Sequence, residues 1–351
     1  MNGMQLHSYG VPAGPAQKRI GFFLPHTFAI MPFIAALEPL RAANRYSGEN
    51  LYSWHIYGET DAPALCNNGI EIQVEGGLET ASDLARILVA GPHDPHRILL
   101  KETIPYLKKL AQHGTYMGAF DTGCFLLARA NLIKNKCTLH WENIPGFREE
   151  FPNVEVSTEL FEIDGNLFTC AGGAASMDMM LNIIQDDHGN ELARRVAELF
   201  VNTSIRTGNE PQRMNVQHRH GIYHKGMVDT IELMETNIEQ PLTTQELAEC
   251  VGISKRQLER LFRAHLQSTP THYYQTLRLK ESKRLLANHP VHCRSCSRLW
   301  FPVSWALLQA ISTAIWVDTA RSARNLRESA CWLATCFLPR AGPDNAAQPA
   351  C

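Results

Sequence analysis

The sequence predicts an α/β domain, built on a mainly parallel sheet with helices on both faces, followed by a smaller all-α helix-turn-helix domain. Short apolar strands alternate with longer amphipathic helices between residues 19 and 200, and two short helices flank a glycine after residue 240. Alternation of this kind favours parallel strands, because each crossover helix covers one face of the sheet. A chain of 351 residues has room for both domains.

The first domain is expected over residues 18–203. Short apolar or alternating runs indicate its strands, and longer runs with helical spacing indicate its helices. The expected strands are 20–24, 52–57, 70–74, 85–90, 116–120, 154–156, 160–163 and 167–170, and the expected helices are 30–44, 104–113, 124–132, 176–184 and 190–200. Residues 204–225 contain Gly208, Pro211 and Gly221 among polar and basic side chains, which predicts a linker.

Composition is that of a globular protein from a reducing compartment. Hydrophobic residues make up 44% and charged residues 19% of the chain, and the formal net charge is −2, so any affinity for nucleic acid must come from a local basic patch. Residues 1–17 lack the apolar core of a signal peptide, and no run reads as a membrane span. The cysteines before residue 290 follow no pattern, so we expect a cytoplasmic protein.

Two capping boxes mark the second domain, which is expected over residues 226–290. Thr243 and Glu246 fit the start of one short helix, and Ser254 and Gln257 fit the start of the next. A glycine between them marks where the first helix must stop. Apolar side chains at helical spacing would pack the two helices on each other: Ala248, Val251, Ile253, Leu258, Leu261 and Phe262. This is the layout of a helix-turn-helix.

The second short helix carries the residues expected to contact DNA. Its N-terminal part would enter the major groove, where Arg and Gln bond base edges and Lys contacts phosphate. The assigned positions are Ser254, Lys255, Arg256, Gln257 and Arg260. Acidic residues precede this helix and basic residues dominate it, which suits a polyanion. The alternative is an ordinary amphipathic helix pair with a solvated charged face.

The residues around this helix pair resemble the AraC-type regulator domain in order and spacing. The resemblance covers LTTQELAECVGISKRQLERLFRAHL and then STPTHYYQTLRLKESKRLL, in which Pro270 opens a long central helix. It implies a regulator of transcription that binds operator DNA, forms a homodimer, and contacts RNA polymerase if it activates. It also implies a second helix-turn-helix after Leu286.

Residues 291–351 do not supply that second motif in the given reading frame. They contain no Lys or Tyr, yet hold four of the six Trp and five of the ten Cys. Read one nucleotide later, the codons behind residues 291–302 permit the expected helix and turn, and those behind residues 310–321, at a second offset, permit a second recognition helix. The hypothesis is a frameshifted second motif, and resequencing the locus tests it. Cys293 and Cys296 have zinc-ligand spacing, but no second pair accompanies them, so no metal is expected.

Residues 118–132, GAFDTGCFLLARANL, form the most informative segment of the first domain. A strand that ends in a sharp glycine-containing turn before a helix is a nucleophile-elbow layout, which holds the turn residue over a pocket. The region resembles the PfpI-type, class I glutamine amidotransferase-like domain found fused to AraC-type domains. Further matches are ALEPLRAAN at 36–44, TLHWE at 138–142 and CAGGAASMDMMLNII at 170–184. The resemblance implies a flavodoxin-like sheet sandwiched by helices, as in regulators of arginine, glycine betaine or carnitine catabolism.

The residue at the turn differs from that of enzymes with this fold, which have Cys where this chain has Asp121. A carboxylate cannot replace a thiolate for attack on an amide, but it can pair with a cationic ligand. The expected effector-binding residues are Glu38, Asp121, His140 and Trp141, of which Trp141 offers a cation-π face. The resemblance implies an amino acid or a quaternary amine as effector. Alternatively, the two carboxylates could pair or cap locally, and His140 and Trp141 could belong to the core.

Three functions are compatible with the sequence. The first is a DNA-binding transcriptional regulator, controlled by a small metabolite in its first domain, without enzymatic activity or cofactor. The second is a hydrolase or amidotransferase that uses Cys124, just beyond the turn. The third is a remnant that no longer binds DNA because the second motif is lost. Asp121 at the turn argues against the enzyme.

Overall fold

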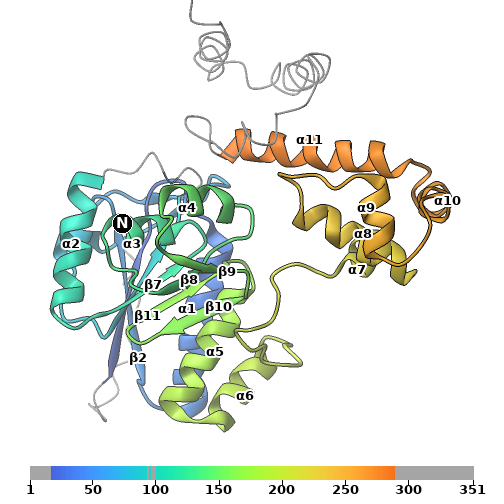
Figure 1. The fold of residues 1–351 in the computed structure, drawn as a ribbon. Helices are drawn as coiled ribbons and strands as arrows, with labels where there is room; N and C mark the ends of the chain where they lie inside the picture. The colour runs from blue at the N-terminus through green and yellow to red at the C-terminus, as the bar shows by residue number, and fades with distance from the viewer. Residues whose placement is uncertain (1–16, 93–94, 96–99, 289–351) are drawn as a thin grey trace, which may run out of the picture. The chain divides into compact units, whose positions relative to one another are not determined.

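The computed structural model describes residues 17–92, 95 and 100–288 (Figure 1). The chain divides into two compact units, Met1–Tyr223 and His224–Cys351. The hypothetical frameshifted motif in residues 291–351, together with its two closely spaced cysteines, lies outside the described residues.

The first unit is built on a seven-stranded sheet with the predicted, mainly parallel topology. Neighbouring strands are parallel except β10 and β11, which are antiparallel at one edge. The order across the sheet is β10 (Phe161–Asp164), β11 (Leu167–Cys170), β7 (Tyr116–Phe120), β6 (Arg86–Ala90), β1 (Lys18–Phe23), β2 (Tyr52–Gly58) and β5 (Gly76–Gly77). Because β2 and β6 lie on opposite sides of β1, the chain reverses its direction across the sheet beside β1. Ligands of open α/β sheets bind at the carboxyl ends of the strands near such a reversal.

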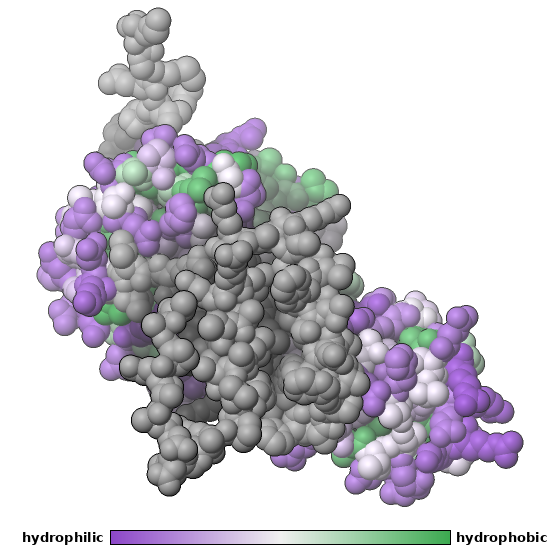
Figure 2. Space-filling view, turned by 90° about the horizontal axis from the view of Figure 1, so that it is seen from above, coloured by the Kyte–Doolittle hydropathy of each residue, from purple (hydrophilic) through white to green (hydrophobic). Residues whose placement is uncertain are grey.

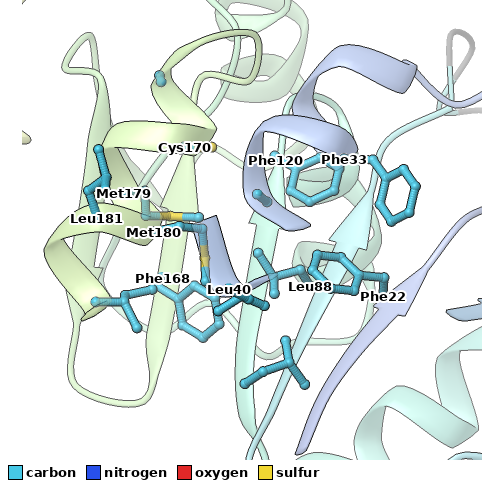
Figure 3. Packing of buried hydrophobic residues seen from close by; sticks show 14 of the residues in the cluster. Phe22, Phe33, Leu40, Leu88, Phe120, Phe168, Cys170, Met179, Met180 and Leu181 are labelled. Atoms are coloured by element: carbon cyan, nitrogen blue, oxygen red, sulfur yellow. The ribbon is translucent and has the colours of Figure 1, made fainter. Parts of the chain in front are cut away.

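Helices cover both faces of this sheet, as predicted. One apolar layer is formed with α1 (Ile30–Ser47), α5 (Ala175–His188) and α6 (Asn190–Leu199), and the other with α2 (Leu100–Gln112), α3 (Gly123–Arg129) and α4 (Ile144–Glu150). Successive strand residues point to opposite layers, because side chains alternate along a strand. Phe22 of β1 belongs to the first layer, whereas Phe23 belongs to the second. Figure 3 shows the first layer, where Phe33 and Leu40 of α1 lie over the sheet.

Short strands outside the main sheet differ from the prediction. β3 (Ala64–Leu65) and β4 (Glu71–Ile72) form an antiparallel pair of their own, so the strand expected over residues 70–74 is shorter and does not join the main sheet. The cause is the turn at Gly69 (φ +86), which folds the chain back on itself. An unexpected strand, β8 (Lys136–Thr138), pairs in parallel with β9 (Glu155–Ser157). A 3-10 turn, η1 (Leu78–Thr80), follows β5.

Part of the predicted linker, residues 204–225, is built into the first unit. The carboxylate of Asp178 on α5, only 2% exposed, accepts hydrogen bonds from the Arg206 guanidinium at 2.6 and 2.9 Å and from the Arg206 backbone N–H at 3.2 Å. A short helix, α7 (Val216–His220), follows within the same segment. The polar residues that suggested a linker instead provide partners for buried polar groups.

The second unit contributes four described helices. They are α8 (Lys225–Thr236), α9 (Thr244–Cys250), α10 (Lys255–Leu266) and α11 (Pro270–Asn288). The pair α9 and α10 forms the predicted helix-turn-helix, with Leu247 of α9 and Leu258 and Phe262 of α10 buried. Gly252, at φ +70, lies in the turn between them.

The coloured part of the face drawn in Figure 2 is mainly polar. In the view of Figure 2, most coloured residues are hydrophilic and the hydrophobic ones form small patches. Scattered exposed apolar side chains are ordinary for folded proteins. None of the described helices is long and apolar enough to cross a membrane.

An ion-pair network joins three strand starts to α5. Asp187 of α5 accepts hydrogen bonds from Lys18 of β1, from the Tyr52 hydroxyl of β2 at 2.9 Å, and from two nitrogens of Arg86 of β6 at 3.0 Å each. Burial alone would raise the pKa of the Asp187 carboxyl, but the hydrogen bonds from Lys18, Arg86 and Tyr52 hold this pKa below its ordinary value. One carboxylate therefore fixes the amino ends of β1, β2 and β6 relative to a covering helix.

Replacing Asp187 by Asn should lower the free energy of unfolding by about 2–3 kcal/mol at neutral pH, because two cations lose their counter-charge in a largely buried site. A carboxyl whose pKa is depressed by folding stabilises the protein above its unfolded pKa, about 4, and this contribution is lost as pH falls through the folded pKa. Urea unfolding of both proteins across acid pH should show the difference shrinking. Asp186→Asn, at an exposed neighbour, is the control. A constant difference would contradict the assignment.

Candidate functional site

The turn after β7 has the geometry of a nucleophile elbow. Asp121 has φ +57, in the left-handed region, and its N–H donates to a carbonyl at the end of β11 at 3.1 Å. A Cβ atom on Gly123 would lie 2.2 Å from the carbonyl oxygen of Val89 on β6. A Cβ atom on Gly91 would lie 2.0 Å from Oγ1 of Thr122. Glycine at both positions lets the turn and β6 approach more closely than any side chain permits.

Asp121 lies at the carboxyl edge of the sheet, between α1 and the loop after β11. A Cβ atom on Gly172 (φ +86) would lie 3.1 Å from Cβ of Asp121 and 3.4 Å from Cγ of Pro32 in the first turn of α1. Asp adopts the left-handed backbone more readily than most residues. The same residue therefore fits the turn and brings a carboxylate to the edge where ligands bind in open α/β sheets.

The thiols near this turn are buried, and burial disfavours their thiolate forms. Cys124 is fully buried in α3, where its Sγ donates to the carbonyl oxygen of Thr138 at 3.1 Å. Burial raises the pKa of the Cys124 thiol well above its ordinary value, and neighbouring thiols and Asp121 raise it further. Burial likewise raises the pKa of Cys170 to about 12. Nucleophilic attack requires a thiolate, which these environments disfavour.

Glu38 is paired with a residue of its own helix. Its carboxylate accepts hydrogen bonds from Arg41, three residues along the same helix, with a closest distance of 2.6 Å. Glu38 also lies six residues beyond Pro32 on α1, which corresponds to about 9 Å along the helix axis. Local pairing, the structural alternative for this residue, is what the structure shows.

His140 and Trp141 follow β8, whose last residue is Thr138. Because the Cys124 thiol bonds to the Thr138 carbonyl, the segment that carries both rings begins beside the first turn of α3. The two ring centroids are 5.7 Å apart, and Nδ1 of His140 lies 3.7 Å from a carboxylate oxygen of Glu142. The guanidinium of Arg213 stacks on the Trp141 ring, with its carbon 4.4 Å from the ring centroid. Nothing in the sequence pairs residues so far apart, and this contact was not predicted.

Both predicted capping boxes are present in the second unit. Thr243 N–H donates to the Glu246 carboxylate at 2.7 Å while Glu246 N–H donates to Oγ1 of Thr243 at 3.2 Å. At the start of α10, Oε1 of Gln257 accepts from the Ser254 N–H and from its hydroxyl, each at 2.9 Å. Ser254 and Gln257 thus fix the start of the helix, and the Gln257 carbonyl is not available for a bidentate contact to a base.

The basic residues of α10 are exposed. Lys255, Arg256, Arg260 and Arg263 all face solvent, whereas Leu258 and Phe262 on the same helix are buried. Arg256, Arg260 and Arg263 are spaced four and three residues apart, so they share one face of the helix. This face has the charge and the reach for the phosphates and base edges of a DNA major groove.

Two residues of α11 that sequence reasoning did not assign join this helix to the residues after α8. The Tyr274 hydroxyl donates to the carbonyl of Asn237 at 2.7 Å, and Nε of Arg278 donates to the carbonyl of Ile238 at 3.0 Å. Both carbonyls follow the end of α8, where helix carbonyls lack partners. Burial lowers the pKa of Arg278, which is 8% exposed. Arg278 therefore belongs to the core rather than to the DNA-facing surface.

The helix-turn-helix with its exposed basic helix, preceded by a separate α/β unit, is the architecture of a DNA-binding regulator. A family model described as a helix-turn-helix domain matches residues 247–293. Three transcriptional regulators of Pseudomonas aeruginosa are similar over most of the chain. CdhR is 42% identical over 76% of this chain and 79% of its own length, GbdR 38% over 78% and 76%, and ArgR 36% over 77% and 81%. The chain belongs to the AraC-type family of helix-turn-helix transcriptional regulators.

Asp121→Ala should be less stable than Asp121→Gly by about 1 kcal/mol, because only glycine adopts φ +57 without a steric cost from Cβ. Both variants remove the carboxylate, so the difference in their stability reports only the cost of the left-handed backbone conformation. Urea unfolding of the two proteins measures it. Equal stability would mean that the turn relaxes and that its left-handed geometry is not enforced by the surrounding packing.

Proposed function

We propose that this regulator is controlled by a small cationic metabolite, an amino acid or a quaternary amine, bound at the carboxyl edge of its first unit. The observation that carries the proposal is Asp121, a carboxylate held in a left-handed turn where enzymes of the fold present a thiol. A carboxylate in this position pairs with ammonium or guanidinium groups. The raised pKa values of Cys124 and Cys170 argue against either thiol as a nucleophile at this turn.

His140 and Trp141 are the proposed wall of the same site. Their segment begins at the Cys124–Thr138 hydrogen bond, next to the turn that holds Asp121. An aromatic face and a carboxylate together favour a cation over a neutral ligand. Glu38 makes a smaller contribution in this proposal, because Arg41 already balances its charge.

Sequence-specific contacts to operator DNA are assigned to α10. Arg256 and Arg260 would bond base edges, Lys255 would contact phosphate, and Ser254 and Gln257 would hold the helix start. The regulator would act in the cytoplasm as a homodimer and would contact RNA polymerase if it activates. A remnant without DNA binding is the alternative if residues 291–351 do not supply a second motif.

A thermal-shift screen with arginine, glycine betaine, carnitine and related amines should reveal a ligand that stabilises the protein, by about 2.7 kcal/mol at a hundredfold excess over Kd. Asp121→Asn keeps a residue that tolerates the turn but removes the charge, so it should weaken binding of that ligand about tenfold or more. Glu38→Gln is the matched carboxylate control and should have a smaller effect. Unchanged affinity in Asp121→Asn would remove Asp121 from the site.

Arg256→Ala and Arg260→Ala should each lower affinity for operator DNA by about 1–3 kcal/mol without lowering the melting temperature, because both side chains are exposed. Gel shifts with the DNA upstream of the protein's own gene measure the affinity. Lys280→Ala, at an exposed position of α11, is the control. If the unaltered protein does not shift this DNA, the remnant becomes the better interpretation.

A thiol-directed acylating probe should label Cys250 and leave Cys124 unmodified, because Cys250 is exposed and Cys124 is buried with a raised pKa. Peptide mapping of the labelled protein locates the adduct. Selective labelling of Cys124 with turnover of the probe would favour the hydrolase over the regulator.

A further inference from the structure

Residues 205–213, called the strap below, are fastened to the wall of the proposed effector site. The side-chain amide nitrogen of Gln212 donates to Oγ1 of Thr138 and to the carbonyl of Leu139, each at 3.0 Å. It also lies 2.9 Å from the carbonyl of Glu159. These contacts hold the end of the strap against the residues that immediately precede His140.

The last residue of the strap, Arg213, covers the aromatic ring of that wall. Its guanidinium carbon is 4.4 Å from the Trp141 ring centroid, well within cation-π range. Trp141 also packs against the apolar layer that contains α3 and α4. The guanidinium occupies one face of the Trp141 ring, so another cation can stack on that face only if Arg213 moves away.

We propose that Arg213 is an internal occupant of the aromatic cation site, and that a cationic effector displaces it and loosens the strap. This inference rests on the proposed function, in which Trp141 lines the effector site. A ligand shifts a conformational equilibrium only by binding one state better than the other, and competition for a single ring face provides that difference. The chain continues from Arg213 through α7, the last helix of the first unit, to α8, the first helix of the second unit.

Calorimetric titration of the full-length protein with arginine, glycine betaine and carnitine tests whether an effector displaces Arg213. Arg213→Ala removes the internal competitor and should bind the effector about two- to thirtyfold more tightly, the range expected for one cation-π contact. Arg213→Lys retains a cation and should stay near the unaltered affinity. Met214→Ala, at the exposed neighbouring residue, is the matched control and should change nothing.

Hydrogen exchange of peptides that cover residues 206–214 provides a second readout that does not depend on DNA. The effector should accelerate exchange in the unaltered protein, where the Gln212 N–H donates to the Thr158 carbonyl at 3.3 Å. In Arg213→Ala, exchange should already be fast without effector. Melting temperatures of the variants show whether the first unit remains folded.

The outcomes separate this inference from the function on which it rests. If an effector binds the unaltered protein but binds Arg213→Ala equally or more weakly, the proposed displacement of Arg213 is wrong, and the proposed effector site stands. If hydrogen exchange of the strap does not change when the effector binds, the proposed displacement of Arg213 is also wrong. If none of the three compounds binds either protein, the proposed effector class is wrong, and so is the proposed displacement of Arg213.

Discussion

The close approach between β6 and the turn after β7 is the constraint on which the first unit depends. Gly91 and Gly123 leave no room for a side chain, so the backbone of the turn lies directly against the end of β6. That contact forces Asp121 into a left-handed conformation and points α3 back over the sheet. Because Asp121 tolerates this backbone conformation and carries a charge, the turn is a candidate ligand site.

The ion-pair network and the proposed effector site lie at opposite ends of the sheet. At the amino ends of β1, β2 and β6, hydrogen bonds and ion pairs converge on Asp187 and hold the strands in place. At the carboxyl ends, the left-handed turn lies against Gly172, and the segment that leads to His140 and Trp141 begins beside the first turn of α3. A rigid opposite end lets this edge keep a fixed geometry for a ligand.

Competition for the same polar atoms shapes both candidate sites. Gln257 closes the cap of α10, so its carbonyl serves the helix start, and the proposed base contacts fall to the arginines of the exposed face. Arg41 already balances Glu38, and Arg213 already occupies the ring of Trp141. An internal partner for a ligand-binding group lowers the cost of burying that group, and it makes binding an exchange of partners.

Patterns local in sequence determined much of this protein: the alternation of strands and helices, the elbow with Asp121, both capping boxes and the basic face of α10 were all predicted from it. These features depend on backbone preferences and periodicity within a few residues. Only the tertiary structure decided that Arg278 is buried and that Arg213 lies on Trp141. It also showed that part of the expected linker belongs to the first unit. Long-range partners of polar side chains depend on which buried groups the folded chain leaves unsatisfied, and no local pattern carries that information.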